Sequence, residues 1–257
     1  MCTVTYIPLG NSDFILTSSR DIPFSRKKAD HPQKIKEDDI ELCYPKDGKA
    51  GGTWIGLSDK KRLICLLNGG FEYHTSRTNY AKSRGLIVKE LLKADDLHKG
   101  FQRVDLENVE QFTLTIVDWH KELELIEFIW DGTKKHIKLM SQEPHIWSSS
   151  TLYDKSVKQL RREWFLKWQK DNVVLGFSTK SILSKDEVLK TGFGKEIQKS
   201  ILDFHHNAGI GDAFIDVMMD RGVGGTVSIT SIKKKNDQLS MHYEDVFTKE
   251  KSAIQIP

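Results

Sequence analysis

Short β-strand patterns that come in pairs, separated by turn-forming residues, are the feature that most restricts the fold of this chain. Residues 2–7 alternate apolar and polar side chains, and residues 14–19 do so again after the turn-rich segment 8–13. A second pair, 51–57 and 62–70, is separated by a short polar turn at 58–61. The pattern therefore predicts two β-hairpins near the start of the chain.

The rest of the chain continues as runs of strands and runs of helices. Further strands are predicted at 112–117, 123–130, 134–140, 225–232 and 239–244, and helices at 86–94, 106–111, 154–171, 185–190 and 195–206. Segment 23–48 is rich in charge and proline and is interpreted as an excursion over the surface, with Arg26 in a solvated charge run. Because strands and helices do not alternate strictly, we expect an α+β layered fold with mainly antiparallel sheets. No linker is visible, so residues 1–257 are expected to form a single domain.

Composition restricts the partners and the cellular compartment. A net charge of +3 and a pI near 8.6 are too modest to indicate a nucleic-acid partner. The chain has three cysteines without paired spacing, which is typical of a reducing compartment. No apolar run approaches the roughly 20 residues needed to span a bilayer. We therefore expect a cytoplasmic protein without an integral membrane segment.

The N-terminus offers a possible nucleophile. If Met1 is removed, Cys2 carries both a thiol and a free α-amine. The unperturbed pKa of a thiol is about 8.5 and that of an α-amine about 7.7–8.0, so near neutral pH the amine can take the thiol's proton. A cysteine after a start codon is also commonly inert. The surrounding residues must therefore decide between these two interpretations.

The two hairpins bring three polar residues towards this N-terminus. Arg20 and Asp21 follow the second strand, and Asn68 ends a buried strand just before two glycines. In a regular strand, Arg20 and Asp21 point to opposite faces, so either the strand bends or one of them lies outside the site. An asparagine at this place is also typical of a turn. The nine histidines are scattered, so no metal site is expected.

Several short motifs occur together in an unusual combination. They are Met1-Cys2 at the start of a strand, Ser19-Arg20-Asp21-Ile22, Gly51-Gly52-Thr53-Trp54-Ile55-Gly56, Leu67-Asn68 and Ser83-Arg84-Gly85. In this combination the chain resembles the NRDE family, also called the transport-and-Golgi-organisation protein 2 family. The resemblance covers nearly the whole chain and extends to its C-terminal hairpin.

The resemblance implies an N-terminal-nucleophile hydrolase fold with four αββα layers, related to cysteine-type amidases that cleave bile-salt and penicillin V amides. It implies that Cys2 is the nucleophile and that Asp21 orients its α-amine. It also implies that Arg20 lowers the pKa of the thiol and that Asn68 stabilises an oxyanion. The family tends to carry an asparagine at the position of Ser149. A ligand pocket is expected to include Thr53, Trp54 and Ser149.

Two functions follow as hypotheses. The first is hydrolysis of a linear amide bond in a small or acyl-containing metabolite, which requires no cofactor. The second follows from the family's link to haem mobilisation and acyl-CoA or lipid handling, and is non-catalytic binding and trafficking of haem, acyl-CoA or lipid. In that case His74, Cys65 or Tyr73 could serve as an axial haem ligand, although each is also an ordinary surface or core residue.

Overall fold

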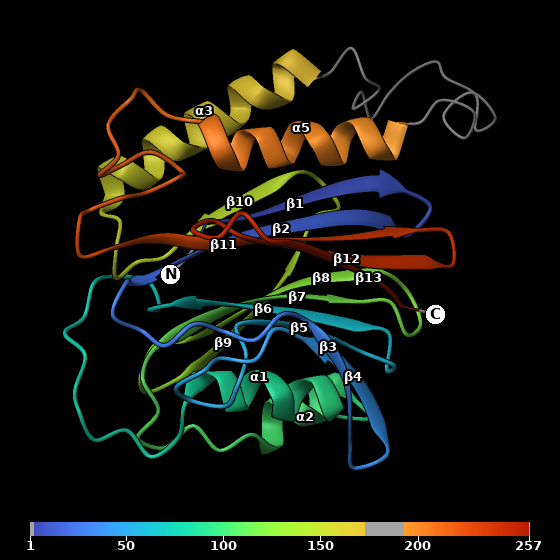
Figure 1. Cartoon of the computed structure of the whole chain (residues 1–257). Helices are drawn as coiled ribbons and strands as arrows, with labels where there is room; N and C mark the ends of the chain where they lie inside the picture. Colours follow the sequence, from blue (N-terminus) through green and yellow to red (C-terminus); the bar gives the residue numbers. More distant parts are fainter. Residues whose placement is uncertain (1–2, 173–192, 257) are drawn as a thin grey trace.

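The computed structural model describes residues 3–172 and 193–256, in which two antiparallel sheets face each other and carry helices on their outer faces (Figure 1). The layers follow one another as helices, sheet, sheet, helices, which confirms the expected αββα arrangement (Figure 1). Met1, Cys2 and the helix predicted at 185–190 lie outside the described residues.

The first sheet is built around the N-terminal hairpin. Its strands, in spatial order, are β10 (His145–Ser148), β1 (Thr3–Gly10), β2 (Asp13–Pro23), β11 (Gly224–Lys235), β12 (Gln238–Asp245) and β13 (Lys251–Ile256). Asn11 and Ser12 both have positive φ angles, of 50° and 64°, which is the backbone of a tight hairpin turn. The predicted hairpins are confirmed, whereas the sequence did not indicate β10 and β13.

The second sheet is a meander in chain order. Its strands are β3 (Gln33–Glu37), β4 (Ile40–Tyr44), β5 (Ile55–Ser58), β6 (Arg62–Asn68), β7 (Phe112–Asp118), β8 (Glu124–Trp130) and β9 (Lys135–Met140). The interpretation of 23–48 as a surface excursion was wrong in part, because β4 extends the sheet and buries Leu42 and Tyr44. Asp38 and Asp39 supply the left-handed turn between β3 and β4, with φ angles of 51° and 62°.

Helices cover each outer face. α1 (Arg84–Lys93) and α2 (Leu97–Arg103) lie on the second sheet, and α3 (Lys155–Asn172) and α5 (Phe193–Asn207) lie on the first (Figure 1). The prediction of a helix at 106–111 was wrong. The chain forms α2 earlier, where Asp96 caps the helix by accepting a hydrogen bond from the backbone N–H of Lys99. Leu106 lies in the loop that follows α2 and is buried there, so its apolar side chain reflects burial of the loop and not a helix.

The two faces of the first sheet have different environments. On β1, Val4 and Tyr6 belong to the core between the sheets, while Ile7 packs beneath α3 and α5. The same alternation on β2 directs Leu16 towards the second sheet and Ile15 towards the helices. No described helix is long and apolar enough to cross a membrane. The alternation decides which way each polar side chain at the end of β2 points.

Candidate active site

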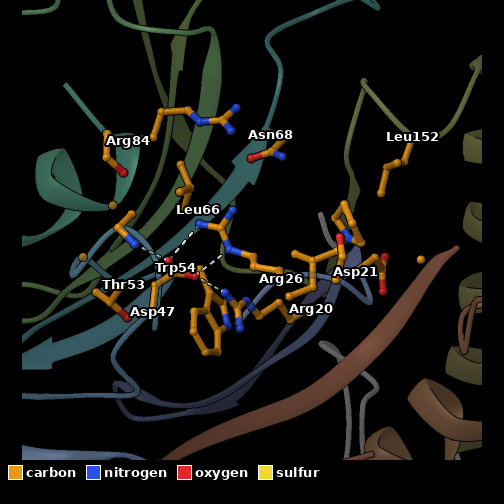
Figure 2. Close-up of a pocket in the computed structure, with 18 of the residues that line it drawn as sticks. Arg20, Asp21, Arg26, Asp47, Thr53, Trp54, Leu66, Asn68, Arg84 and Leu152 are labelled. Carbon is orange, nitrogen blue, oxygen red and sulfur yellow. Dashed lines mark hydrogen bonds and ion pairs between the residues drawn. The ribbon is translucent and has the colours of Figure 1, made fainter. Parts of the chain in front are cut away.

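A cavity of about 570 Å³ lies at the end of β2. Its wall includes side chains from β2, β6, the start of α1 and the segments before β5 and β11, some of which are seen in Figure 2. Apolar side chains such as Leu66, Leu152, Met219 and Val223 cover much of it. The cavity is large enough for a small organic ligand.

Arg20 faces the second sheet from the end of β2. Its guanidinium lies 3.7 Å from the centroid of the Trp54 ring and forms an ion pair with Asp47. Arg26 forms two hydrogen bonds of 2.8 Å with the same carboxylate, from Nε to Oδ2 and from Nη2 to Oδ1 (Figure 2). One buried aspartate therefore anchors two arginines on the cavity wall, and both contacts are strong because the groups are charged.

The protonation of Asp47 follows from these contacts. Burial on its own would raise the pKa of the carboxyl. The hydrogen bonds from Arg26 and the Ala50 backbone, together with the charges of Arg26 and Arg20, outweigh burial and lower the pKa to about 2. Asp47 is therefore ionised at neutral pH and balances part of the positive charge of the cavity.

Asp21 points to the opposite face of β2, towards the helices. Its carboxylate accepts a hydrogen bond of 2.7 Å from the Tyr153 hydroxyl and another of 2.7 Å from Thr226 Oγ1. Opposite this point, the register of β11 shifts between Thr226 and Ser228. Arg20 and Asp21 nevertheless line the same cavity, because both lie at its edge on the last part of β2.

Asn68 ends β6 between two cavities. It lines the large cavity and also a second cavity of about 210 Å³, which Ser149 and Ser150 line as well. Ser149 Oγ donates to the backbone oxygen of Asn68 (2.7 Å), so the serine fixes the backbone at this position. Asn68 Oδ1 is buried and has no hydrogen-bond partner among the described residues. A ligand that spanned both cavities would contact the Asn68 side chain and could supply the missing partner of its Oδ1.

Thr53 and Trp54 line the large cavity beside a close backbone contact. Thr53 Oγ1 lies 2.8 Å from the carbonyl oxygens of both Pro45 and Ile55, and its single hydroxyl proton is shared between these two acceptors, which holds this loop in place. A Cβ atom added to Gly52 would lie only 2.6 Å from the carbonyl carbon of Gly85. Glycine is therefore required here for the loop to approach the start of α1.

The predicted nucleophile, Cys2, lies outside the described residues. The described chain begins at Thr3, whose Cα pairs with that of Ser19, one residue before Arg20. The structure thus brings Arg20, Asp21, Asn68, Thr53 and Trp54 to one cavity, and it places Ser149 at the adjoining one.

Sequence reasoning missed several charged residues of the wall. Arg26 was interpreted as part of a solvated charge run, but it is only 28% exposed and is paired with Asp47. Arg84 is paired with Glu110 (2.9 Å), and burial lowers its pKa. Arg221 donates to the carbonyls of Leu152 and Phe214. The Ser83-Arg84-Gly85 motif could have identified Arg84 as a cavity residue. No sequence motif marked Arg221.

The three residues considered as haem ligands lie elsewhere. Cys65 is fully buried in the core, Tyr73 is 71% exposed, and His74 lies 3.3 Å from a carboxylate oxygen of Glu110. None of the three is among the described residues that line the large cavity.

The two antiparallel sheets with helices on their outer faces have the N-terminal-nucleophile hydrolase fold. Three solved structures of this fold are similar to the chain. An N-acylethanolamine-hydrolysing acid amidase orthologue from Caenorhabditis elegans has a TM-score of 0.59 at 11% identity, with 100% of both chains covered. A penicillin V acylase from Agrobacterium tumefaciens has a TM-score of 0.53 at 11% identity, covering 100% of this chain and 86% of that one. A conjugated bile acid hydrolase from Clostridium perfringens has a TM-score of 0.51 at 12% identity, covering 100% of this chain and 92% of that one.

The family follows from the sequence itself. Residues 1–251 match the profile of the family described as Transport and Golgi organisation 2. The chain belongs to this family. Comparison with curated proteins gives no significant match.

Proposed function

We propose that this chain is a cytoplasmic hydrolase that uses Cys2 to cleave a linear amide bond of an acyl-containing metabolite. The observation that carries the proposal is the arrangement at the end of β2. There the first described residue, Thr3, pairs with Ser19, which directly precedes Arg20 and Asp21. Arg20 and Asp21 line the same cavity as Asn68. Hydrolases are among the proteins with similar structures, although that similarity concerns the fold alone.

The proposed reaction has two steps. The Cys2 thiolate attacks the amide carbon, so that a C–S bond forms, and the C–N bond then breaks as the amine leaves with the thiol's proton. Water next attacks the thioester and releases the carboxylic acid and the free thiol. Asn68 is proposed to donate to the transient oxyanion, and Arg20 to favour the thiolate by its charge.

The two cavities suggest how the substrate lies. The larger one, with its apolar side chains, suits the acyl half, and the smaller one beyond Asn68 suits the departing amine. The reacting carbonyl would then lie beside Asn68, which borders both cavities.

The decisive test begins with an intact mass to establish that Met1 is absent, followed by a screen of N-acyl amides of increasing acyl length. We expect turnover that Cys2→Ala abolishes while the circular dichroism spectrum stays unchanged. A retained Met1, or full activity in Cys2→Ala, contradicts the proposal.

Asn68→Ala is expected to lower kcat by about 10²–10³ because an oxyanion donor acts mainly in the transition state. The measurement is steady-state kinetics on the best amide from the screen. Asn207→Ala is a matched control, since Asn207 is exposed at the end of α5. An unchanged kcat in Asn68→Ala would remove this residue from the mechanism.

A carrier function for an acyl ligand is the second candidate. It is favoured by the lining of the large cavity, which has four arginines, Arg20, Arg26, Arg84 and Arg221, against two aspartates. This excess of positive charge suits an acyl ligand with an anionic group, such as an acyl-CoA. Tight binding of such a ligand without turnover, measured by calorimetry, would favour the carrier over the hydrolase.

A further inference from the structure

The smaller cavity, of about 210 Å³, carries charged and polar groups that the proposed reaction does not use. Its wall combines residues of β6, β7 and β8 from the second sheet, β10 from the first sheet, and the first half of α3. Pockets for drug-sized ligands usually measure about 300–1,000 Å³, so this cavity suits a smaller group. It meets the larger cavity at Asn68, which lines both.

Two buried oxygen atoms in this wall have no hydrogen-bond partner within residues 3–172 and 193–256. They are Asn68 Oδ1 and Ser150 Oγ. Ser150 is 5% exposed and packs against Gly69, where an added Cβ atom would collide with the serine hydroxyl. A serine hydroxyl can donate to an anionic oxygen. Because buried polar atoms are normally partnered, these two atoms indicate that a polar ligand group enters the cavity.

α3 brings positive charge to the same cavity. Lys158 and Arg162 both line it, and they lie on one face of α3 because residues four apart are neighbours on a helix. The ammonium group of half-buried Lys158 makes no hydrogen bond or ion pair with the part of the chain that the structure describes. Burial and the positive charge of Arg162 lower the pKa of Lys158, and the opposing effect of Glu72 is smaller. A bound anion would therefore supply the partner that this lysine lacks.

One carboxylate also lines the smaller cavity, but it is already engaged. Glu127 Oε2 accepts a hydrogen bond of 2.7 Å from Trp147 Nε1 on β10. The wall therefore has two cationic side chains against one anionic side chain, and the anionic one is held by a neighbour. This balance favours a ligand group with a negative charge.

We propose that the smaller cavity binds the carboxylate of an amino acid, so that the ligand of this site is an N-acyl amino acid. Lys158 pairs with the carboxylate, and Ser150 Oγ donates a hydrogen bond to it. Arg162 is exposed and adds a weaker attraction. The inference rests on the proposed function, in which the acyl half fills the larger cavity and the amine half fills the smaller one.

The test uses two ligands that a thiolate cannot cleave, because a sulfonyl group replaces the amide carbonyl in both. N-octylsulfonyl glycine ends in a carboxylate, whereas N-octylsulfonyl ethanolamine ends in a hydroxyl. Isothermal titration calorimetry at pH 7 gives both dissociation constants. We expect the wild-type chain to bind the glycine ligand about tenfold more tightly or better, since hydrogen bonds between charged groups are the stronger ones.

Lys158→Gln removes the charge with little change in side-chain length, and it should reduce the preference for the carboxylate to about threefold or less. Ser150→Ala should weaken binding of the glycine ligand by about threefold. Lys155→Gln is the matched control, because Lys155 lies on the same helix, is 91% exposed and is not part of the cavity wall. The control should keep the wild-type preference, and circular dichroism checks that all variants are folded.

The inference is overturned if the wild type binds neither ligand, if it binds both equally, or if Lys158→Gln keeps the full preference. An equal loss in Lys155→Gln would also overturn it, because the effect would then be one of general charge. Neither ligand requires turnover, so a carboxylate preference in a chain that cleaves no amide would refute the hydrolase and leave the binding site standing. Conversely, amide turnover without a carboxylate preference would leave the hydrolase standing and refute the site.

Discussion

Asp47 shows how much of the cavity depends on one side chain. It lies in the loop between β4 and β5 and accepts from Arg20, from Arg26 and from the backbone N–H groups of Lys49 and Ala50. Removing one partner from a buried ion pair leaves the other charged and unpaired, which is costly. The arginine side of the cavity is therefore expected to lose its order when Asp47 is neutralised.

Asp47→Asn is predicted to lower the free energy of unfolding by about 3 kcal/mol at pH 7. The folded pKa of Asp47, about 2, lies below the unfolded value of 3.8, so its contribution is present above pH 4 and is lost as the pH falls towards 2. Urea unfolding at pH 7 and near pH 3 measures the difference. Asp39→Asn is the control, since the Asp39 side chain is 96% exposed. Equal stability of Asp47→Asn and wild type at pH 7 would contradict the assignment.

At the scale of elements, α5 is attached to the N-terminal hairpin by a buried histidine. His205 Nδ1 lies 2.7 Å from Ser19 Oγ on β2, and Nε2 lies 2.9 Å from Thr5 Oγ1 on β1. Burial, with smaller effects from the positive charges of His206 and Arg161, lowers the pKa of His205 to about 3. The folded protein therefore holds this imidazole neutral where the unfolded chain takes up a proton.

Acid should weaken this attachment. Because the folded pKa lies below the unfolded value of 6.5, stability is fully present above pH 6.5 and falls below it, by about 2 kcal/mol at pH 5. His205→Gln should lack this component of the pH dependence, although it is less stable at pH 7.5. Chemical denaturation between pH 5 and 7.5 measures both effects. The variant at exposed His98, His98→Gln, should retain the slope of the wild type, and a wild-type slope in His205→Gln would refute the prediction.

At the scale of the whole molecule, the cavity belongs to both sheets. Arg20 comes from the first sheet, Leu66 and Asn68 come from the second, and Leu152 comes from the segment between β10 and α3 (Figure 2). A ligand that fills the cavity would therefore tie the layers together. Binding to the folded state alone stabilises it by mass action.

An N-acyl amide at ten times its dissociation constant is predicted to stabilise the Cys2→Ala protein by about 1.4 kcal/mol, which raises its melting temperature by about 3–5 °C. Leu152→Trp should abolish the shift because the indole occupies the cavity. Leu166→Trp, on the exposed side of α3, should keep it. Differential scanning fluorimetry measures all three, and a shift that persists in Leu152→Trp would place the ligand elsewhere.

Local chemistry determined the elements of this fold. The patterns that indicate a strand, a helix or a turn each extend over only a few neighbouring positions. Most of the strands, together with α1, α3 and α5, could therefore be predicted from the sequence. The position of Arg20 and Asp21 near the N-terminus followed from a single short hairpin. β10 and β13 were missed because they are short edge strands without a strong apolar pattern.

Only the tertiary structure decided the contacts of the site. The hydrogen bond between Tyr153 and Asp21 joins residues 132 positions apart, and that between Thr226 and Asp21 joins residues 205 apart. Arg26 and Asp47 lie in loops, before β3 and after β4, where the sequence has no helical or strand period. The physical reason is that the energy of a buried charge depends on which distant groups surround it, and local periodicity does not encode those groups.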